Sequence, residues 1–240
     1  MMAKKTTKSM SILAVALFFL AAASLPSSAQ TVKSQIQRMT GWQSCVTCAG
    51  INASGPGASI YTATTSSPSL SGVSRVFSIA SSSPYADALW WKQLGAANGA
   101  YNLVYDVYFY LTTPQYSQAL EFDNNQANGQ KRWIFGTQCN IAGGHWDVWG
   151  NAAGNWISTG IPCYMPSAYK WHHLTWKFKR NGGYVTYISF TLDGVTHYVN
   201  RSYPARSSSV NELNVAFQMD MKSYHAAYKT WLDNVKLTYW

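Results

Sequence analysis

Apolar and polar residues alternate with a period of two through much of the chain. Residues 102–111 place Leu103, Tyr105, Val107 and Phe109 in one phase and mostly polar side chains in the other. Because successive side chains of a strand point to opposite faces, this pattern predicts a strand with one buried face. We expect further strands at 59–64, 73–79, 118–123, 131–139, 172–180, 184–192, 195–200, 212–220 and 231–240.

Turn signals separate these segments. Asn128-Gly129 lies between two of them, and Asp193-Gly194 is the strongest hairpin signal in the chain. Helix signals are scarce, so the fold class is all-β. At least eight strands without a Pro- or Ser-rich linker after residue 85 indicate one domain. Two antiparallel sheets packed face to face, a β-sandwich of the jelly-roll type, would bury one face of each sheet. We expect the Ser-, Gly- and Thr-rich segment 47–83 to form edge strands and long loops.

The first 29 residues have the form of a signal peptide. Three lysines precede an apolar run at 12–23, and Ser27-Ser28-Ala29 has the small-x-small form of a cleavage site. The run is shorter than the roughly 20 residues that span a membrane. We therefore expect residues 1–29 to be removed and residues 30–240 to form an exported domain, secreted to the extracellular space or the periplasm.

The chain is basic, with 18 Lys and Arg, nine Asp and Glu, and a net charge of +9. Removing the leader takes three lysines, which leaves 15 basic residues and a net charge of +6. The basic residues are scattered rather than clustered, so nucleic acid is not an expected partner. The assembly state stays open.

Four cysteines follow the leader, which fits an oxidising compartment. Three pairings exist, and we favour Cys45–Cys48 with Cys139–Cys163, because the second would fasten the Gly- and Trp-rich excursion between these two residues to the sheet. A redox or zinc site would need a βαβ context or four nitrogen or sulfur ligands, and neither is visible.

Two acidic residues, Glu121 and Asp123, lie in the segment 119–126. Side chains two apart on a strand share a face, with alpha carbons about 6.6 Å apart. Their carboxylates could converge on one substrate atom, whereas the alternative is that they line the solvated face of an amphipathic strand.

The Glu121-Phe122-Asp123 strand, the W-x-x-x-L-G pattern at 90–95 and the segment 232–237 resemble the concanavalin A-like lectin and glucanase superfamily. The resemblance implies a sandwich whose concave sheet faces carbohydrate. In lichenase- and laminarinase-type β-glucanases the first Glu is the nucleophile and the Asp supports it, which implies these roles for Glu121 and Asp123. The third acid of that pattern is replaced by Asn125 or Gln126, which cannot donate and recover a proton.

A hydrolase would therefore need an acid from another strand, and the candidates are Asp106, Glu212 and Asp220. Legume lectins continue the same strand into a metal-binding loop, but Ala127 and Arg132 stand where its ligands would fall. We expect no metal ligands and no cofactor. A single structural calcium would need six to eight oxygen ligands, and no acidic cluster in the sequence supplies them.

Aromatic and amide side chains complete the predicted site. Three tryptophans lie among glycines in the 139–163 excursion, which we expect to be a loop. Their rings could contact a ligand, and the alternative is that they cap one end of the sandwich. The candidate ligand-binding residues are Asn125, Gln126, Gln138, His145, Trp146, Trp149, Trp156, Asn214 and Gln218. The leading hypothesis is a secreted, lectin-like protein that binds a polysaccharide or glycan in a groove of the concave sheet. The alternative is a polysaccharide-cleaving enzyme, either a glycoside hydrolase with Glu121 as nucleophile or a lyase that uses Tyr or His.

Overall fold

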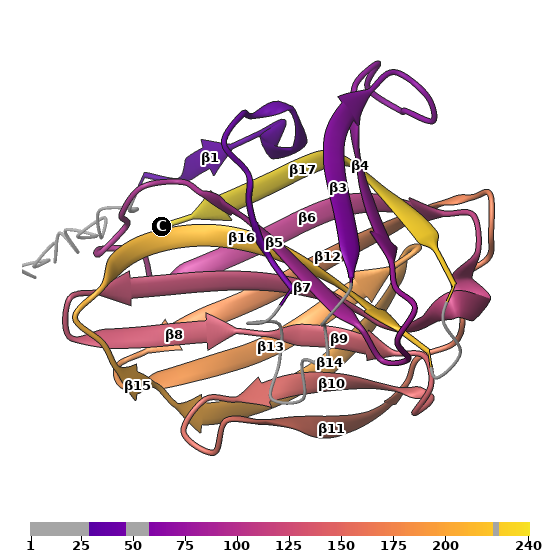
Figure 1. Cartoon of the computed structure of the whole chain (residues 1–240). Helices are drawn as coiled ribbons and strands as arrows, with labels where there is room; N and C mark the ends of the chain where they lie inside the picture. Colours follow the sequence, from indigo (N-terminus) through magenta and orange to yellow (C-terminus); the bar gives the residue numbers. More distant parts are fainter. Residues whose placement is uncertain (1–28, 47–57, 223–225) are drawn as a thin grey trace, which may run out of the picture.

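Two antiparallel sheets packed face to face make up the protein (Figure 1). The structure is a computed structural model that describes residues 29–46, 58–222 and 226–240. The eight-stranded sheet, called sheet A here, has the order β14-β13-β12-β6-β17-β4-β3, with β1 paired to β17. Its strands are β1 (Thr31–Lys33), β3 (Ser59–Thr65), β4 (Ser74–Ala80), β6 (Asn102–Leu111), β12 (Trp171–Asn181), β13 (Tyr184–Leu192), β14 (Val195–Pro204) and β17 (Tyr228–Tyr239).

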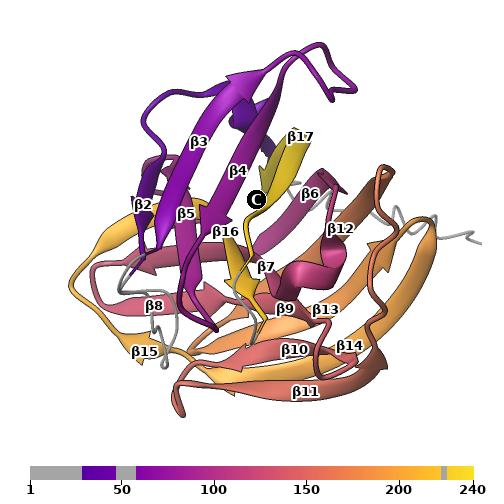
Figure 2. The same ribbon diagram turned by 45° about the vertical axis from the view of Figure 1, so that its right-hand side comes forward.

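The nine-stranded sheet, called sheet B, has the order β11-β10-β9-β7-β16-β5-β2. In addition, β8 pairs with β7 on one side and with β15 on the other. Figure 2 shows the two layers from a second side. The strands of sheet B are β2 (Gln43–Cys45), β5 (Asp87–Gln93), β7 (Ser117–Asn128), β8 (Lys131–Phe135), β9 (Thr137–Asn140), β10 (His145–Gly150), β11 (Asn155–Pro162), β15 (Arg206–Ser207) and β16 (Asn211–Met221). Two short 3-10 helices, η1 (Ile36–Arg38) and η2 (Pro114–Tyr116), connect strands.

The core lies between the sheets and follows the alternation of the sequence. Strand β6 buries every second residue, so that Phe109 meets Phe122 of β7 across the sandwich, with ring centroids 5.1 Å apart. Phe122 also contacts Phe217 of β16 at 5.4 Å. Aromatic pairs at these distances add to the stability gained by burying their area. This packing leaves the opposite phase of β7 and β16 on the outer face of sheet B.

The prediction of an all-β sandwich is confirmed. The predicted strand at 102–111 matches β6 residue for residue, and the Asp193-Gly194 turn joins β13 to β14. Both turn residues have positive φ, 48° and 85°, as the tight hairpin requires. Of the two predicted edge strands, β3 lies at the edge of sheet A, whereas β4 is paired on both sides.

The excursion between Cys139 and Cys163 differs from the prediction of a loop. It forms β10 and β11, which extend sheet B beyond β9 through antiparallel pairing. The predicted strand at 131–139 is divided at Gly136 into β8 and β9, and β5 was not predicted at all. These strands form because partners distant in the sequence complete their hydrogen bonds, which a local pattern does not reveal.

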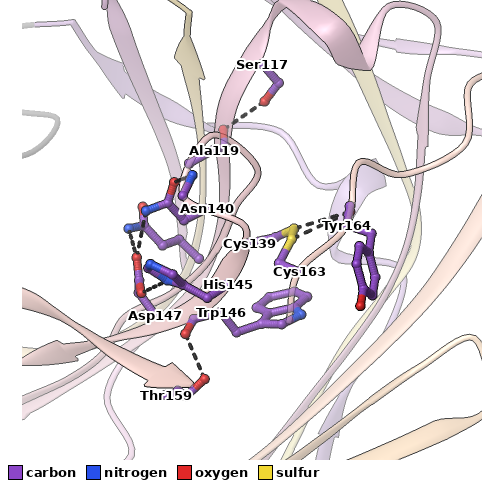
Figure 3. Close-up of a disulfide and its surroundings, with 12 residues drawn as sticks. Ser117, Ala119, Cys139, Asn140, His145, Trp146, Asp147, Thr159, Cys163 and Tyr164 are labelled. Atoms are coloured by element: carbon purple, nitrogen blue, oxygen red, sulfur yellow. Dashed lines mark hydrogen bonds and ion pairs between the residues drawn. A yellow bond between two sulfur atoms is a disulfide. The ribbon is translucent and has the colours of Figure 1, made fainter. Parts of the chain in front are cut away.

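Cys139 and Cys163 form the predicted disulfide, which lies against Trp146 (Figure 3). Cys45 is disulfide-bonded as well, whereas its predicted partner Cys48 lies outside the described residues. The predicted signal peptide falls there too, except for residue 29. Within the described ranges no helix is long and apolar enough to cross a membrane.

Candidate functional site

The outer face of sheet B carries two adjoining hollows. One, the aromatic hollow, has a volume of about 640 Å³, and the other, the acidic hollow, about 890 Å³. Glu121, Trp156 and Gln218 line both, so the hollows form one groove. The rest of the aromatic hollow is lined by Gln43, Leu89, Trp91, Gln93, Asp123, Asn125, Arg132, Ile134, Gly136, Trp149, Val210, Glu212, Asn214 and Ala216. The rest of the acidic hollow is lined by Tyr85, Asp87, Gln118, Gln138, Asn140, His145, Asp147, Asn155, Ser158 and Asp220.

Strand β7 runs along the floor of the groove. Its alternation sends Glu121, Asp123 and Asn125 into the groove, while Leu120 and Phe122 enter the core. The register then aligns polar side chains across the sheet, because Glu121 pairs with Gln218 on β16 and with Gln138 on β9. Cross-strand neighbours on one face lie within side-chain contact. One strand pattern therefore organises the whole floor.

The aromatic hollow has tryptophans on both sides of the floor. Trp91 comes from β5, while Trp149 and Trp156 come from β10 and β11 and pack edge to face, with ring centroids 5.2 Å apart. The indole nitrogen of Trp149 is buried and makes no hydrogen bond within the described part of the chain. Gly136 lies below this pair, at the break between β8 and β9. These rings give the hollow broad flat apolar walls.

Carboxyl groups gather where the two hollows meet. The amide of Gln218 donates hydrogen bonds to Glu121 Oε1 at 2.6 Å and to Asp220 Oδ1 at 2.9 Å. The carboxyl groups of Glu121 and Asp220 also hydrogen-bond to each other, as do those of Asp220 and Asp87. Asp87 and Asp220 are direct neighbours in the register of β5 and β16. Three acids from three strands thus form one hydrogen-bonded row.

Burial changes the protonation of this row. Loss of hydration raises the pKa of Glu121 well above its usual value, and the charges of Asp220 and Asp123 raise it further. The pKa of Asp87 rises to about 8, through burial and then the charge of Asp220. Burial raises the pKa of Asp220 to about 6, although hydrogen bonds from Gln218, Glu121 and Asp87 oppose the rise. The row therefore holds shared protons near neutral pH.

Asp123 lies one step along β7 from this row. Burial raises its pKa to about 7, against a lowering by the backbone N–H of Thr137, which donates to Asp123 Oδ1 at 2.9 Å. Glu121 and Asp123 are only 4% and 8% exposed as whole residues. Both nevertheless line the aromatic hollow, beside polar rather than apolar neighbours. The pair thus forms part of the floor of an open groove.

Each end of the groove has a contact between a basic and an acidic side chain. Arg132 Nη2 lies 2.9 Å from Glu212 Oε1 in the aromatic hollow. In the acidic hollow, His145 Nδ1 lies 2.6 Å from Asp147 Oδ1. The amides of Gln138 and Asn140 donate to the other oxygen of Asp147, at 2.7 Å and 3.1 Å (Figure 3). These contacts hold the side chains of Arg132 and His145 in fixed orientations.

Most of the residues predicted from the sequence come together in the groove. They are Glu121, Asp123, Asn125, Gln138, His145, Trp149, Trp156, Asn214 and Gln218. Asn125 donates its amide to Asn214 Oδ1 at 3.0 Å, across the pairing of β7 with β16. Both tryptophans lie on strands, which corrects the prediction that they belong to a loop.

Two predicted groove residues face the interior, and their prediction was wrong. Gln126 follows Phe122 in the inward phase of β7 and donates to the carbonyl oxygens of Ala97 and Ala100, at 2.6 Å and 3.0 Å. Trp146 is 1% exposed. Figure 3 shows the Trp146 side chain pointing toward the disulfide, on the opposite side of β10 from His145 and Asp147. Period two explains both positions, since each is an odd number of residues from a groove residue on its own strand.

The candidate acids from other strands are separated by the fold. Asp106 lies on sheet A, where it accepts a hydrogen bond from Thr175 and pairs with His173. Glu212 and Asp220 both line the groove, near opposite ends of β16. Only Asp220 contacts Glu121.

Sequence reasoning missed several groove residues, among them Asp87, Trp91, Gln93, Arg132, Asn140 and Asp147. The segment Asp87–Gln93 contains a usable signal, because Asp87, Leu89, Trp91 and Gln93 share one phase and alternate with the buried Ala88 and Trp90.

The groove offers two kinds of contact, flat aromatic walls and a floor of donors and acceptors. Amides can donate and accept, and protonated carboxyl groups can donate as well. Among the described residues, no group of three or more His, Cys, Asp and Glu side chains is arranged to hold a metal ion.

No family model matches the sequence, and no curated protein matches it either. Among solved structures, the cellulose induced protein Cip1 is similar, with a TM-score of 0.53, 13% identity and coverage of 85% of this chain and 96% of that chain. An endo-β-1,4-glucuronan lyase from the fungus Trichoderma reesei gives a TM-score of 0.48, 11% identity and coverage of 82% and 94%.

A structure of carbohydrate-binding modules from the β-sandwich superfamily gives a TM-score of 0.45, 8% identity and coverage of 83% of this chain. The chain spans 57% of the length of that structure. At these identities the likeness concerns the fold. The chain has a two-sheet antiparallel β-sandwich fold.

Proposed function

We propose that the protein binds a polysaccharide in the groove of sheet B. The observation that carries this proposal is the placement of Trp91, Trp149 and Trp156 beside a floor of amide and carboxyl groups. A sugar ring has an apolar C–H face and a rim of hydroxyl groups. The aromatic walls match the first and the polar floor matches the second.

The dimensions of the groove favour a chain over a single sugar. Its lining extends along β7 from Gln118 to Asn125, about 20 Å or more at the rise of a strand. The aromatic and acidic hollows then act as adjoining subsites on either side of Glu121. Binding of this kind needs no cofactor. The disulfide and the leader sequence support the proposal that the protein works outside the cytoplasm.

Affinity electrophoresis through gels that contain single polysaccharides tests the proposal, with isothermal titration for any that retard the protein. We expect Trp149→Ala and Trp156→Ala each to weaken binding by about 10-fold, or about 1.4 kcal/mol. Trp171→Ala is the matched control, because Trp171 is a half-buried tryptophan on sheet A. Failure of every polysaccharide to bind, or equal losses in all three variants, would contradict the proposal.

The row of acids favours a second candidate function, the cleavage of a polysaccharide. A carboxyl group that keeps its proton near neutral pH is what a general acid needs, and Glu121 has a strongly raised pKa. The direct hydrogen bond between Glu121 and Asp220 differs from the separation of about 5–5.5 Å in retaining hydrolases. A lyase would instead draw on Tyr85 or His145, which line the acidic hollow.

Product analysis separates the two functions. Release of reducing ends without unsaturated ends, abolished by Glu121→Gln, would favour hydrolysis, whereas reducing ends accompanied by unsaturated non-reducing ends would favour a lyase. Simple binding predicts neither product. It also predicts that a bound chain is recovered at its original length after prolonged incubation.

A further inference from the structure

The acidic residues of this basic protein are concentrated in the groove. Six of the nine Asp and Glu residues of the chain line the two hollows. They are Asp87, Glu121, Asp123, Asp147, Glu212 and Asp220. The basic side chains of the lining are Arg132 and His145 alone. The lining of the groove therefore contains more acidic than basic side chains, the reverse of the chain as a whole.

Both basic side chains of the lining are already paired with acids of the groove. Arg132 is paired with Glu212 at 2.9 Å, and His145 is paired with Asp147 at 2.6 Å. Releasing either would leave a carboxylate that is almost fully buried without its partner. Such a loss is unfavourable, and the amides of Gln93, Gln138 and Asn140 that still donate to these carboxylates offset only part of it.

The centre of the groove contains no cation at all among the described residues. Asp220 hydrogen-bonds to Glu121 and to Asp87, and the neutral amide of Gln218 donates to Glu121 and Asp220. Glu121 and Asp220 are buried and Asp87 is half-buried, so water screens charges on these groups less than charges on the exposed surface. A carboxylate or sulfate of a ligand placed here would find no cationic partner among the described residues, and it would face the carboxyl group of Asp220, whose pKa is raised only to about 6.

We infer that the groove selects polysaccharides whose sugar units carry no negative charge and excludes chains of uronic acids or sulfated sugars. The inference rests on the proposed function and specifies its ligand class. Hydroxyl groups can hydrogen-bond to Gln218, Gln138 and Asn214 without any charge contact. The net positive charge of the chain alone would suggest the opposite preference.

Matched pairs of polymers test the inference, because the two members of a pair share a backbone and differ in charge. Suitable pairs are hydroxyethyl cellulose with carboxymethyl cellulose, and arabinoxylan with glucuronoxylan. For the backbone that binds, we expect the carboxyl-bearing member to bind at least 10-fold more weakly at 10 mM salt. The difference should persist at 150 mM salt, because salt screens buried charges much less than exposed ones.

A charge-removing variant gives an independent readout. Asp87→Asn combined with Asp220→Asn should raise the affinity for the carboxyl-bearing member at least threefold relative to its neutral counterpart. Asp106→Asn is the control, because Asp106 lies on sheet A among Thr175, His173 and Lys236. Equal or tighter binding of the carboxyl-bearing polymer, or an unchanged ratio in the double variant, would overturn the inference while leaving the proposed function intact. Binding of no neutral and no charged polymer would overturn the proposed function, and this inference with it.

Discussion

Trp149 packs edge to face against Trp156, with their ring planes inclined at 72°. The two residues are cross-strand neighbours on β10 and β11, joined by the turn at 151–154. Their pairing builds one wall of the groove from a segment whose glycines and tryptophans resemble a loop.

Gly136 is expected to be required for this wall. A β-carbon added there would lie 2.8 Å from Trp149 Cβ and 3.4 Å from Trp156 Cη2. Gly136→Ala should therefore displace Trp149, lower stability by about 1–3 kcal/mol and weaken polysaccharide binding. Gly99→Ala is the control, since open space surrounds that position. Thermal unfolding and titration on both variants check the prediction, and similar results for the two would contradict it.

Substitutions of the neighbouring residues Gln126 and Asn125 should have different effects, one mainly on stability and the other mainly on ligand affinity. Gln126→Ala removes the donor to two carbonyl oxygens and should cost about 1–3 kcal/mol of stability with ligand affinity unchanged. Asn125→Ala changes a groove residue bonded to Asn214 and should lower affinity with a smaller effect on stability. Urea unfolding combined with titration measures both effects. A loss of affinity only in the Gln126 variant would contradict the placement of the two side chains.

The carboxyl groups of the groove make stability depend on pH. The pKa of Asp87, Glu121, Asp123 and Asp220 is raised in the folded protein, mainly by burial. Between about pH 4 and pH 8 the folded state therefore binds more protons than the unfolded state, so the free energy of unfolding falls as pH rises. We expect Tm to decrease from pH 5 to pH 8, by about 2–4 °C for each kcal/mol lost.

Two other acidic residues, Asp193 and Asp233, affect the free energy of unfolding in a lower pH range. Hydrogen bonds outweigh burial and lower the pKa of Asp193 and Asp233, so their contribution is lost only below about pH 4. The double variant Asp87→Asn and Asp220→Asn should flatten the decrease of Tm between pH 5 and pH 8. A Tm that rises across this range in the parent protein would contradict the assignment.

The Cys139–Cys163 disulfide should stabilise the β10–β11 wall. It closes a loop of 24 residues that contains both strands, so its removal should lower stability by about 2–4 kcal/mol. The variant with serine at both positions can be compared with the parent protein by thermal unfolding and by limited proteolysis. We expect early cleavage at 151–154, the turn between β10 and β11. An unchanged Tm would show that packing around Trp146 suffices alone.

The alternation of apolar and polar residues predicts well which face of a long strand is buried, because burying one face requires an apolar residue at every second position. It placed Glu121 and Asp123 together and identified the buried phase of β6. Gln126 was misplaced because the predicted strand ended at Asp123, whereas pairing with β16 extends β7 to Asn128 and continues the alternation. Extending the phase from Phe122 would have assigned Gln126 to the core.

The acidic row could not be predicted, because it depends on which strands are neighbours. Asp87, Glu121 and Asp220 are far apart in the sequence and meet only through the order β5-β16-β7. Hydrophobic patterns define the face of a strand but not its partner. Trp146 was misplaced for a related reason, since the glycines around it indicated a loop and concealed the pairing of β10 with β9.

Strand β17 lies between β4 and β6 in sheet A, although it follows both by more than one hundred residues. Its buried residues Leu232 and Leu237 therefore fill the middle of a layer whose flanking strands are synthesised much earlier. Until residues 228–239 arrive, β4 and β6 have unpaired edges that face each other across a gap. The order of synthesis thus makes the completion of this sandwich a late event, and a nascent chain cut short before residue 228 would expose an aggregation-prone cleft.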